Sequence, residues 1–95
     1  MTNLANMKAY EVIHLPEHSR FEIRVDQHVA LLEYQLDGNT ITIHHTYVPT
    51  ELRGKNLASS LAAAALAFAK GSQLQVIPQC SYIEAYMKRT QFKQL

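Results

Sequence analysis

The sequence predicts an α+β domain with a mixed sheet and the element order β-β-β-α-β-α. Segments 20–25, 29–36 and 40–48 alternate apolar and polar residues, as half-buried strands do. Residues 54–70 carry apolar side chains at helical spacing, and a short apolar run at 74–77 follows them. A strand, a helix and another strand within this distance predict a right-handed βαβ crossover, which makes the last strand parallel to the one before the helix.

The first three strands are separated by two turn signals. Phe21, Ile23 and Val25 fall on one side of the first strand, which Asp26-Gln27 ends as a turn. The tripeptide Asp37-Gly38-Asn39 lies between two alternating runs and supplies residues that tolerate positive φ. It predicts a hairpin, so the second and third strands are antiparallel.

Pro49 ends the third strand because it has no N–H to donate, and a helix is predicted from about Gly54 to Lys70. Its alanines favour helix and are small enough to let it lie close to a sheet, and Gly71 is the predicted residue just past its end. After the strand at 74–77, Ser81 is predicted to cap a last helix that runs to about Arg89 and buries Ile83, Tyr86 and Met87. Residues 1–19 form an arm or an irregular strand.

Composition excludes several classes of partner. Nine Lys and Arg against eight Asp and Glu give a net charge of +1, so no overall field attracts nucleic acid or an anionic membrane. The single cysteine, Cys80, cannot form an internal disulfide and suits a reducing compartment. No segment has the apolar length of a signal peptide or membrane span, so a cytoplasmic location is expected.

The segment from Val48 to Ala58 joins a strand to a helix N-terminus, where backbone N–H groups lack helical partners. Gly54 lets an anion approach the backbone, and Arg53 and Lys55 add positive charge beside it. These residues predict a phosphate site. The alternative is a helix that simply starts with Gly and solvated basic side chains.

Three motifs occur in order on these elements. They are His45-Thr46-Tyr47-Val48-Pro49 at a strand end, Arg53-Gly54-Lys55-Asn56-Leu57-Ala58 at a helix start, and Pro78-Gln79-Cys80-Ser81-Tyr82 before the last helix. Over residues 20–92 the chain resembles the small single-domain GNAT-like N-acetyltransferases, sometimes called YjdJ-type. The resemblance implies that residues 20–95 form an acyl-CoA-binding domain with a GNAT-like mixed sheet.

The resemblance also implies acetyl-CoA as cosubstrate, lying between the third and fourth strands. Glu51 and Asn56 depart from the wider pattern of the superfamily, although Asn tolerates the left-handed conformation. The cofactor-binding residues that the resemblance implies are Tyr47 and Val48 for the pantetheine arm, and Arg53, Gly54, Lys55, Asn56, Leu57 and Ala58 for the pyrophosphate.

Three residues are catalytic candidates by the same resemblance. Cys80 is a candidate acyl acceptor or CoA-facing thiol, His45 a candidate general base, and Tyr86 a candidate proton donor to the leaving thiolate. Each has a structural alternative: a small buried hydrophobe, a satisfied histidine and a core aromatic, respectively. His44 and His45 are adjacent on a strand, so they are expected to point to opposite faces.

The leading prediction is an acetyl-CoA-dependent N-acetyltransferase that acts on an amine, either a small molecule or a protein lysine, as a monomer or homodimer. The alternatives are a CoA-binding module without turnover and a small interaction domain. No metal is expected, because the histidines have no pair spacing typical of a site. Lys88, Arg89 and Lys93 form a basic patch that could reach a CoA phosphate or an acidic partner, or be solvated.

Overall fold

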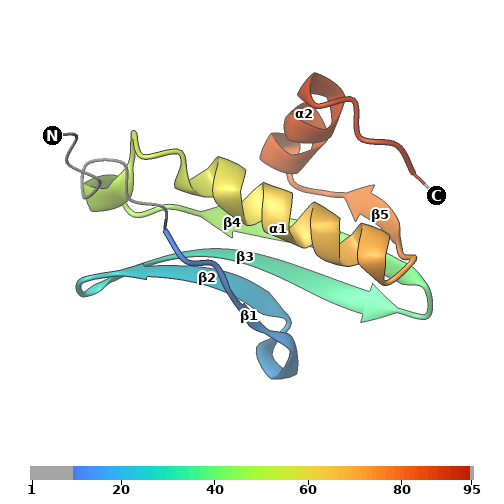
Figure 1. Cartoon of the computed structure of the whole chain (residues 1–95), viewed down its shortest axis with the longest axis horizontal. Coiled ribbons are helices and arrows are strands. Elements are labelled where there is room, and N and C mark those ends of the chain that lie inside the picture. The colour runs from blue at the N-terminus through green and yellow to red at the C-terminus, as the bar shows by residue number, and fades with distance from the viewer. Residues whose placement is uncertain (1–9, 95) are drawn as a thin grey trace, which may run out of the picture.

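The computed structural model describes residues 10–94, in which a five-stranded sheet is combined with two α-helices and two short 3-10 helices (Figure 1). The strands are β1 (Ile13–Leu15), β2 (Arg20–Val25), β3 (His28–Asp37), β4 (Thr40–Tyr47) and β5 (Gln75–Pro78). The helices are α1 (Leu57–Gly71), α2 (Ser81–Arg89), η2 (Pro16–His18) and η3 (Thr50–Leu52). The predicted α+β class and the order of its six elements are confirmed.

The strands lie in the sheet in the same order as in the chain. β1 to β4 pair antiparallel, whereas β5 follows α1 and lies parallel to β4. Asp26 before β3 has φ 56° and Gly38 before β4 has φ 62°, so both predicted turns use the left-handed backbone that these residue types tolerate. Because β5 follows α1 and lies parallel to β4, the predicted parallel crossover is confirmed.

β1 is a short edge strand within the segment that the sequence left unassigned. Ile13 lies opposite Glu22 and Leu15 opposite Arg20, so β1 and β2 form a hairpin around η2. Residues 1–9 of that segment lie outside the described residues.

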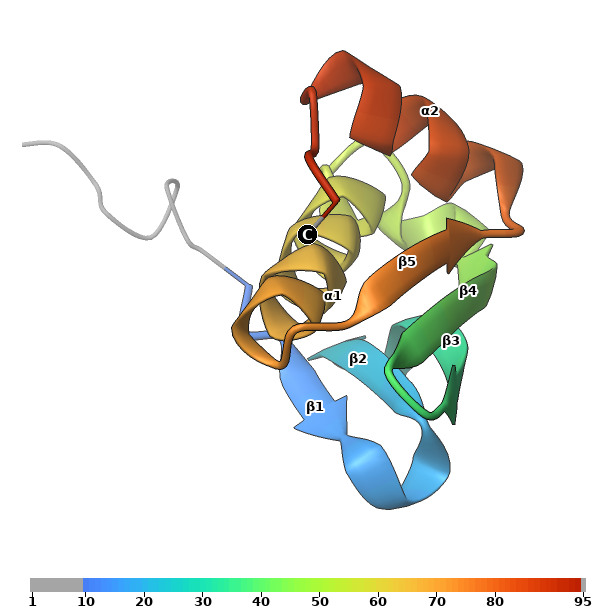
Figure 2. The ribbon, with the colours of Figure 1, turned by 90° about the vertical axis from the view of Figure 1, so that its right-hand side faces the viewer.

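The core lies between the sheet and α1, which runs across one face (Figures 1 and 2). α2 lies beside α1, and no helix in residues 10–94 covers the opposite face of the sheet. The alanines of α1 allow the close approach that the sequence predicts. The buried hydrophobic side chains from the strands are Phe21, Ile23, Ala30, Leu32, Tyr34, Ile41, Ile43 and Val76; those from the helices are Leu52, Leu57, Leu61, Ala62, Ala65, Leu66, Ala69 and Ile83.

β1 adds a histidine to this core that the sequence pattern did not single out. The ring of His14 stacks on Phe21 with centroids 4.0 Å apart, and it meets Phe68 of α1 edge-on at 4.6 Å. Its Nε2 lies 2.7 Å from the Tyr34 hydroxyl. Burial lowers the pKa of His14, although the charge of Glu17 partly opposes this, so the surroundings favour the neutral imidazole.

α1 begins at Leu57, later than the predicted start at Gly54. Gly54 has φ 82° and Asn56 has φ 61°, and neither backbone conformation can continue a right-handed helix. Asn56 occupies the N-cap position, and its carbonyl accepts the first helical hydrogen bond from the Ser60 N–H at 3.1 Å. The prediction that Asn56 can adopt the left-handed turn is thus confirmed.

Two predicted helix ends are wrong. Gly71 is the last residue of α1 rather than the residue after it, because the left-handed position falls at Gln73, with φ 57°. Ser81 lies inside α2, and Cys80 occupies its N-cap position without a side-chain cap. At the end of α1 the N–H groups of Gln73 and Leu74 bond to the carbonyls of Lys70 and Ala69, so the helix closes beyond Gly71. At the start of α2 the Cys80 carbonyl accepts the first helical hydrogen bond, from the Glu84 N–H, so Ser81 is not the cap.

Candidate active site

The strand β4 has one residue more than β3 in the middle of their pairing. Ile43 lies opposite Tyr34 and His45 lies opposite Glu33, so His44 is an extra residue in β4. Such a β-bulge bends the strand and interrupts its alternation, and bulges are common next to active sites.

The bulge brings two histidines to one face of the sheet. Ile43 is buried beneath α1, so His44, which follows it, faces the other side. Thr46 lies opposite the buried Leu32 and therefore faces α1. Because adjacent side chains of a strand alternate, His45 faces the other side, like His44. The prediction that His44 and His45 point to opposite faces is wrong, because it assumed an uninterrupted strand.

β4 and β5 separate at the bulge. Their pairing ends at Ile43, whose carbonyl accepts the N–H groups of Gln79 at 3.0 Å and Cys80 at 3.2 Å, and α2 then begins. Beyond that point, no strand in the described part of the chain pairs with residues 44–47 on this side. The edge of β4 therefore offers backbone N–H and C=O groups to an extended ligand.

The loop between β4 and α1 has the geometry of an anion site. A Cβ added at Gly54 would meet no heavy atom within 4 Å, so the backbone there faces open space. The N–H groups of residues 57–59 begin the helix, and the side chain of Asn56 does not cap them. Arg53 donates its Nε to the Val48 carbonyl at 3.2 Å, which holds the guanidinium beside the loop. Partial positive charge and unpaired N–H groups at a helix start favour phosphate.

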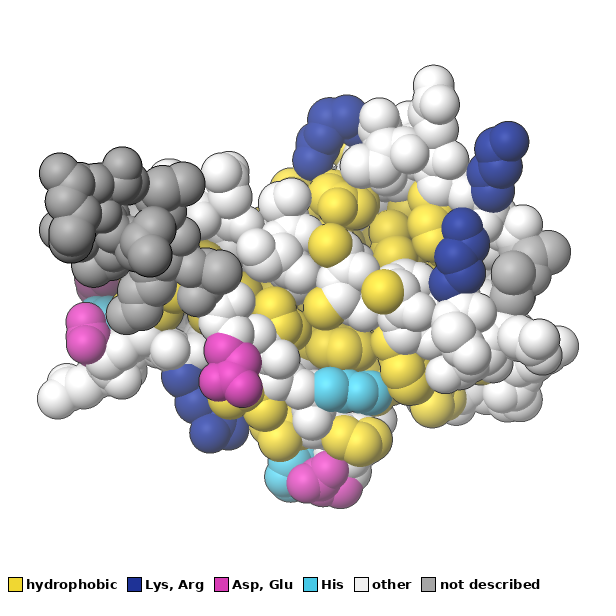
Figure 3. All heavy atoms as spheres, in the orientation of Figure 1, with side chains coloured by type: hydrophobic (Ala, Val, Ile, Leu, Met, Phe, Trp, Pro, Cys, Tyr) yellow, Lys and Arg dark blue, Asp and Glu magenta, His cyan; other side chains and the backbone are white. Residues whose placement is uncertain are grey.

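A hollow of about 330 Å³ opens between this loop and α2. On the face drawn in Figure 3, hydrophobic side chains gather over α1 and toward α2. Tyr47 and Lys55, two of the predicted cofactor-binding residues, are exposed and lie outside the lining of the hollow. The other six line it: Val48, Arg53, Gly54, Asn56, Leu57 and Ala58. The remaining lining residues are Leu52, Ser59, Tyr82 and Arg89.

Two residues of α2 line the hollow without being among the predicted cofactor-binding residues, although Arg89 belongs to the basic patch that could reach a CoA phosphate; Lys88 and Lys93 of that patch line other hollows. Tyr82 and Arg89 are seven positions apart, which places them on one face of a helix, and this spacing is the signal that could have joined them. Tyr86 lies on the same face, with its ring centroid 6.2 Å from that of Tyr82. Tyr86 itself lines a second hollow, next to Leu66 and Lys70 of α1. Tyr86 is therefore not among the residues that line the first hollow, although it contacts two that do, Tyr82 and Arg89.

Cys80 lies where β4 and β5 separate. Its Sγ is 3.5 Å from the Thr46 Oγ1, and the side chain is half buried. Burial alone would raise the pKa of the thiol, but the Thr46 hydroxyl and the nearby backbone N–H groups of Ile83, Tyr82 and Thr46 favour the thiolate and outweigh burial, so the pKa is lowered. A thiol of lowered pKa is a better nucleophile near neutral pH. His45 faces the opposite side of β4 from Thr46, so the structure does not bring His45 and Cys80 together.

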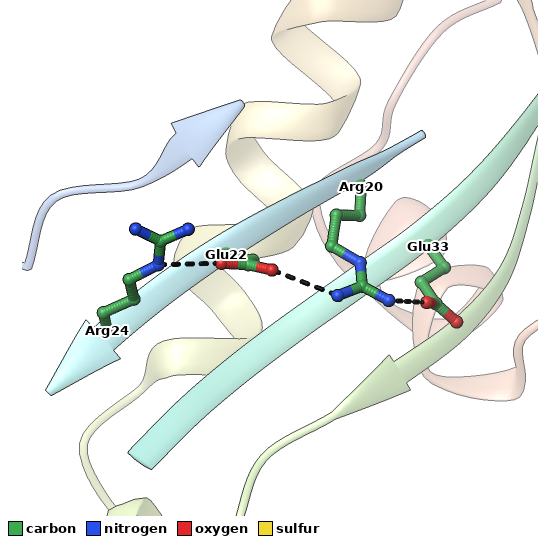
Figure 4. Close-up of polar contacts among 4 residues, drawn as sticks. All are labelled: Arg20, Glu22, Arg24 and Glu33. Atoms are coloured by element: carbon green, nitrogen blue, oxygen red, sulfur yellow. Dashed lines mark hydrogen bonds and ion pairs between the residues drawn. The ribbon is translucent and has the colours of Figure 1, made fainter. Parts of the chain in front are cut away.

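The helix-free face carries a row of four charged side chains from β2 and β3 (Figure 4). Glu22 accepts hydrogen bonds from the Arg24 Nε at 2.9 Å and from an Arg20 Nη at 3.1 Å, and Arg20 also binds Glu33. Burial of Glu22 would raise the pKa of its carboxyl, but the two guanidinium groups outweigh this effect and lower it. The row is neutral in sum, and its last member, Glu33, lies opposite His45.

Within residues 10–94, no group of three or more His, Cys, Asp or Glu side chains is arranged to hold a metal ion. The described helices are all too short or too polar to cross a membrane.

Known proteins resemble this chain in sequence and in fold. Residues 20–95 match the family described as GCN5-related N-acetyl-transferase. The NATD1 proteins of Xenopus tropicalis and Danio rerio are each 35% identical to the chain; the matches cover 82% and 81% of it and 78% and 73% of those proteins. NATD1 of Mus musculus is 33% identical, covering 87% of this chain and 78% of its own length.

The fold has a counterpart among solved structures. The NMR solution structure of a GCN5-like protein of Staphylococcus aureus superimposes with a TM-score of 0.68 at 27% identity, covering 85% of this chain and 80% of the other. The resemblance seen in the three sequence motifs is therefore confirmed. Because the family model spans residues 20–95 and the relatives are up to 35% identical, the chain belongs to the GCN5-related N-acetyltransferase family.

Proposed function

We propose that this protein transfers an acetyl group from acetyl-CoA to an amine. The observation that carries the proposal is the opening between β4 and β5, which lies next to the hollow at the N-terminus of α1. Acetyl-CoA is an elongated molecule with a pyrophosphate, a pantetheine arm that contains two amides, and a thioester at its end. The loop at the start of α1, the stretch of the β4 edge with which no described strand pairs, and the half-buried Cys80 thiol succeed one another in the corresponding order.

The pyrophosphate would lie on the backbone N–H groups at the start of α1, with Arg53 beside it and Gly54 leaving room for close approach. Lys55 would add positive charge near the pyrophosphate without contacting it, since Lys55 does not line the hollow. The pantetheine amides would pair with the edge of β4 near Tyr47 and Val48. Together these contacts orient the thioester, and positioning of this kind lowers the barrier to acyl transfer.

In direct transfer the amine nitrogen attacks the thioester carbonyl carbon. The C–N bond forms, the C–S bond breaks, and CoA leaves as a thiolate that takes up a proton, while the amine loses one. Backbone N–H groups of β4 would polarise the carbonyl, and His45 or water would accept the proton from the amine. In the two-step alternative the Cys80 thiolate takes the acetyl group first, CoA leaves, and the amine then takes the acetyl group from Cys80.

Titration calorimetry with acetyl-CoA tests the binding step. Gly54→Trp should abolish binding, because a large side chain would occupy the space over the loop. Gly38→Trp is a matched control: Gly38 also has positive φ and open space around its Cβ position, but it lies in the β3–β4 turn, away from the hollow. The proposal fails if the wild type shows no binding at millimolar acetyl-CoA, or if both variants bind equally.

A CoA-binding module without turnover is the second candidate. The placement of His45 favours it, because that residue faces away from Thr46 and the Cys80 thiol. Release of free CoA thiol in the presence of polyamines, free lysine and a lysine-containing peptide separates the two functions and distinguishes small acceptors from protein lysines. With turnover established, Cys80→Ser separates the routes, since only the two-step route requires the thiol.

The proposed reaction also fits the cytoplasm, where a lone thiol such as Cys80 stays reduced. A monomer or homodimer could carry it out, since all the proposed contacts come from one chain.

A further inference from the structure

We propose that Arg89 binds the 3′-phosphate of CoA, so that the protein distinguishes CoA from 3′-dephospho-CoA. The inference rests on the proposed function, because it adds a contact to the same ligand.

The charges around the hollow support this assignment. Arg53 on the loop and Arg89 on α2 both line it, and none of its lining residues is Asp or Glu. The two glutamates nearest in sequence to the lining residues do not line the hollow. The Glu51 Oε1 lies 3.8 Å from the His28 Nδ1, and Glu84 lines a different hollow on the other side of α2. The hollow is therefore cationic in a chain whose net charge is only +1.

The two arginines come from opposite walls, which suits a ligand with two separate phosphate groups. Arg53 is tied to the loop through the Val48 carbonyl, next to the N–H groups of α1 that suit the pyrophosphate. The remaining anionic group of CoA is the 3′-phosphate, a monoester that carries close to two negative charges at neutral pH. Arg89 is the cation on the wall away from the loop, so it is the group available for that phosphate.

Aromatic contacts hold Arg89 in place before the ligand arrives. Its Cζ lies 5.1 Å from the centroid of the Tyr86 ring, and Tyr86 in turn stacks on Tyr82 with an angle of 29° between the rings. A guanidinium held over an aromatic ring loses less freedom on binding and still presents its forked N–H groups, which match a phosphate. Tyr82 also lines the hollow and offers an apolar surface to the adenine.

Calorimetric titration of CoA and 3′-dephospho-CoA into the full chain tests the inference. The wild type should bind CoA about tenfold more tightly than 3′-dephospho-CoA, the size expected for one charge-assisted contact at a partly exposed site. Arg89→Gln should weaken CoA binding by about that factor and leave 3′-dephospho-CoA binding unchanged. Lys88→Gln is the matched control, because it removes the same charge from the same helix, while Lys88 lines the hollow that contains Glu84. Circular dichroism confirms that each variant is folded.

The outcomes separate this inference from the function on which it rests. If the wild type binds neither ligand, the proposed function fails and the inference fails with it. If it binds both equally, or if Arg89→Gln keeps the preference for CoA, the CoA site stands and the role of Arg89 is refuted. If Arg89→Gln weakens both ligands by the same factor, Arg89 supports the hollow as a whole and does not read the 3′-phosphate. If Lys88→Gln loses the preference for CoA over 3′-dephospho-CoA as much as Arg89→Gln does, the effect comes from net charge, and a specific contact of Arg89 is refuted.

Discussion

Glu22→Gln should destabilise the protein by about 2 kcal/mol at neutral pH. Glu22 is 7% exposed and accepts hydrogen bonds from two arginines, which on full burial would be worth roughly 1.5–3 kcal/mol each. The side chains of Arg20 and Arg24 are 32% and 54% exposed and can return to water, so the net loss is smaller than that sum. Arg20 also keeps its contact with Glu33 in the variant.

The pH dependence provides a second readout of the same change. Because the pKa of Glu22 is lowered in the folded state, its contribution is present above the ordinary value of 4.5 and is lost as the pH falls through the folded value. The wild type should therefore lose stability below pH 4.5, and Glu22→Gln should lose less over the same range.

Thermal and urea unfolding measure both effects. A loss of 2 kcal/mol corresponds to a fall in Tm of roughly 8–16 °C for a domain of this size. Arg24→Gln is the control and should cost less than about 1 kcal/mol, because the Arg24 side chain is largely in water. The reasoning is refuted if Glu22→Gln unfolds within about 0.5 kcal/mol of the wild type, or if its acid sensitivity is unchanged.

Two further predictions concern titrating groups. Thr46→Val should raise the pKa of the Cys80 thiol, because it removes the hydroxyl that stabilises the thiolate, whereas Thr46→Ser should leave that pKa unchanged. The absorbance of the thiolate as a function of pH measures the pKa in both variants, and equal values would contradict the role of the hydroxyl. His14→Gln should flatten the loss of stability on acidification below pH 6.5, because burial lowers the pKa of His14 and the unfolded chain takes up the proton first; an unchanged slope in urea unfolding would contradict this.

The element order could be predicted because each signal is local. The alternation of 20–25, the turn residues 37–39 and the helical spacing after Pro49 all act within one or two elements, and the structure confirms them. The parallel pairing of β5 with β4 also follows from local spacing, since a strand that returns through a helix has few alternatives. The loop at Gly54 could be found for the same reason, because Gly and basic residues next to a helix start need no distant partner.

The arrangement of the site depended on contacts between distant residues. The bulge at His44 exists only in the register of β4 against β3, and no pattern within β4 marks it, so the two histidines were expected on opposite faces. The helix ends were also set by neighbouring backbone, which placed the left-handed residue at Gln73 rather than at Gly71.

The sequence by itself determined the fold class, the parallel crossover and the Gly54 loop that is proposed to bind phosphate, since these depend on backbone preferences and on the periodicity of apolar residues. Only the tertiary structure decided which side chains share a cavity. Tyr82 and Arg89 line the same hollow as the loop, and Tyr86 lines a second hollow. The Cys80 thiol contacts Thr46, which is distant in the chain. The physical reason is that a cavity is defined by the packing of several elements, which residue spacing within one element does not specify.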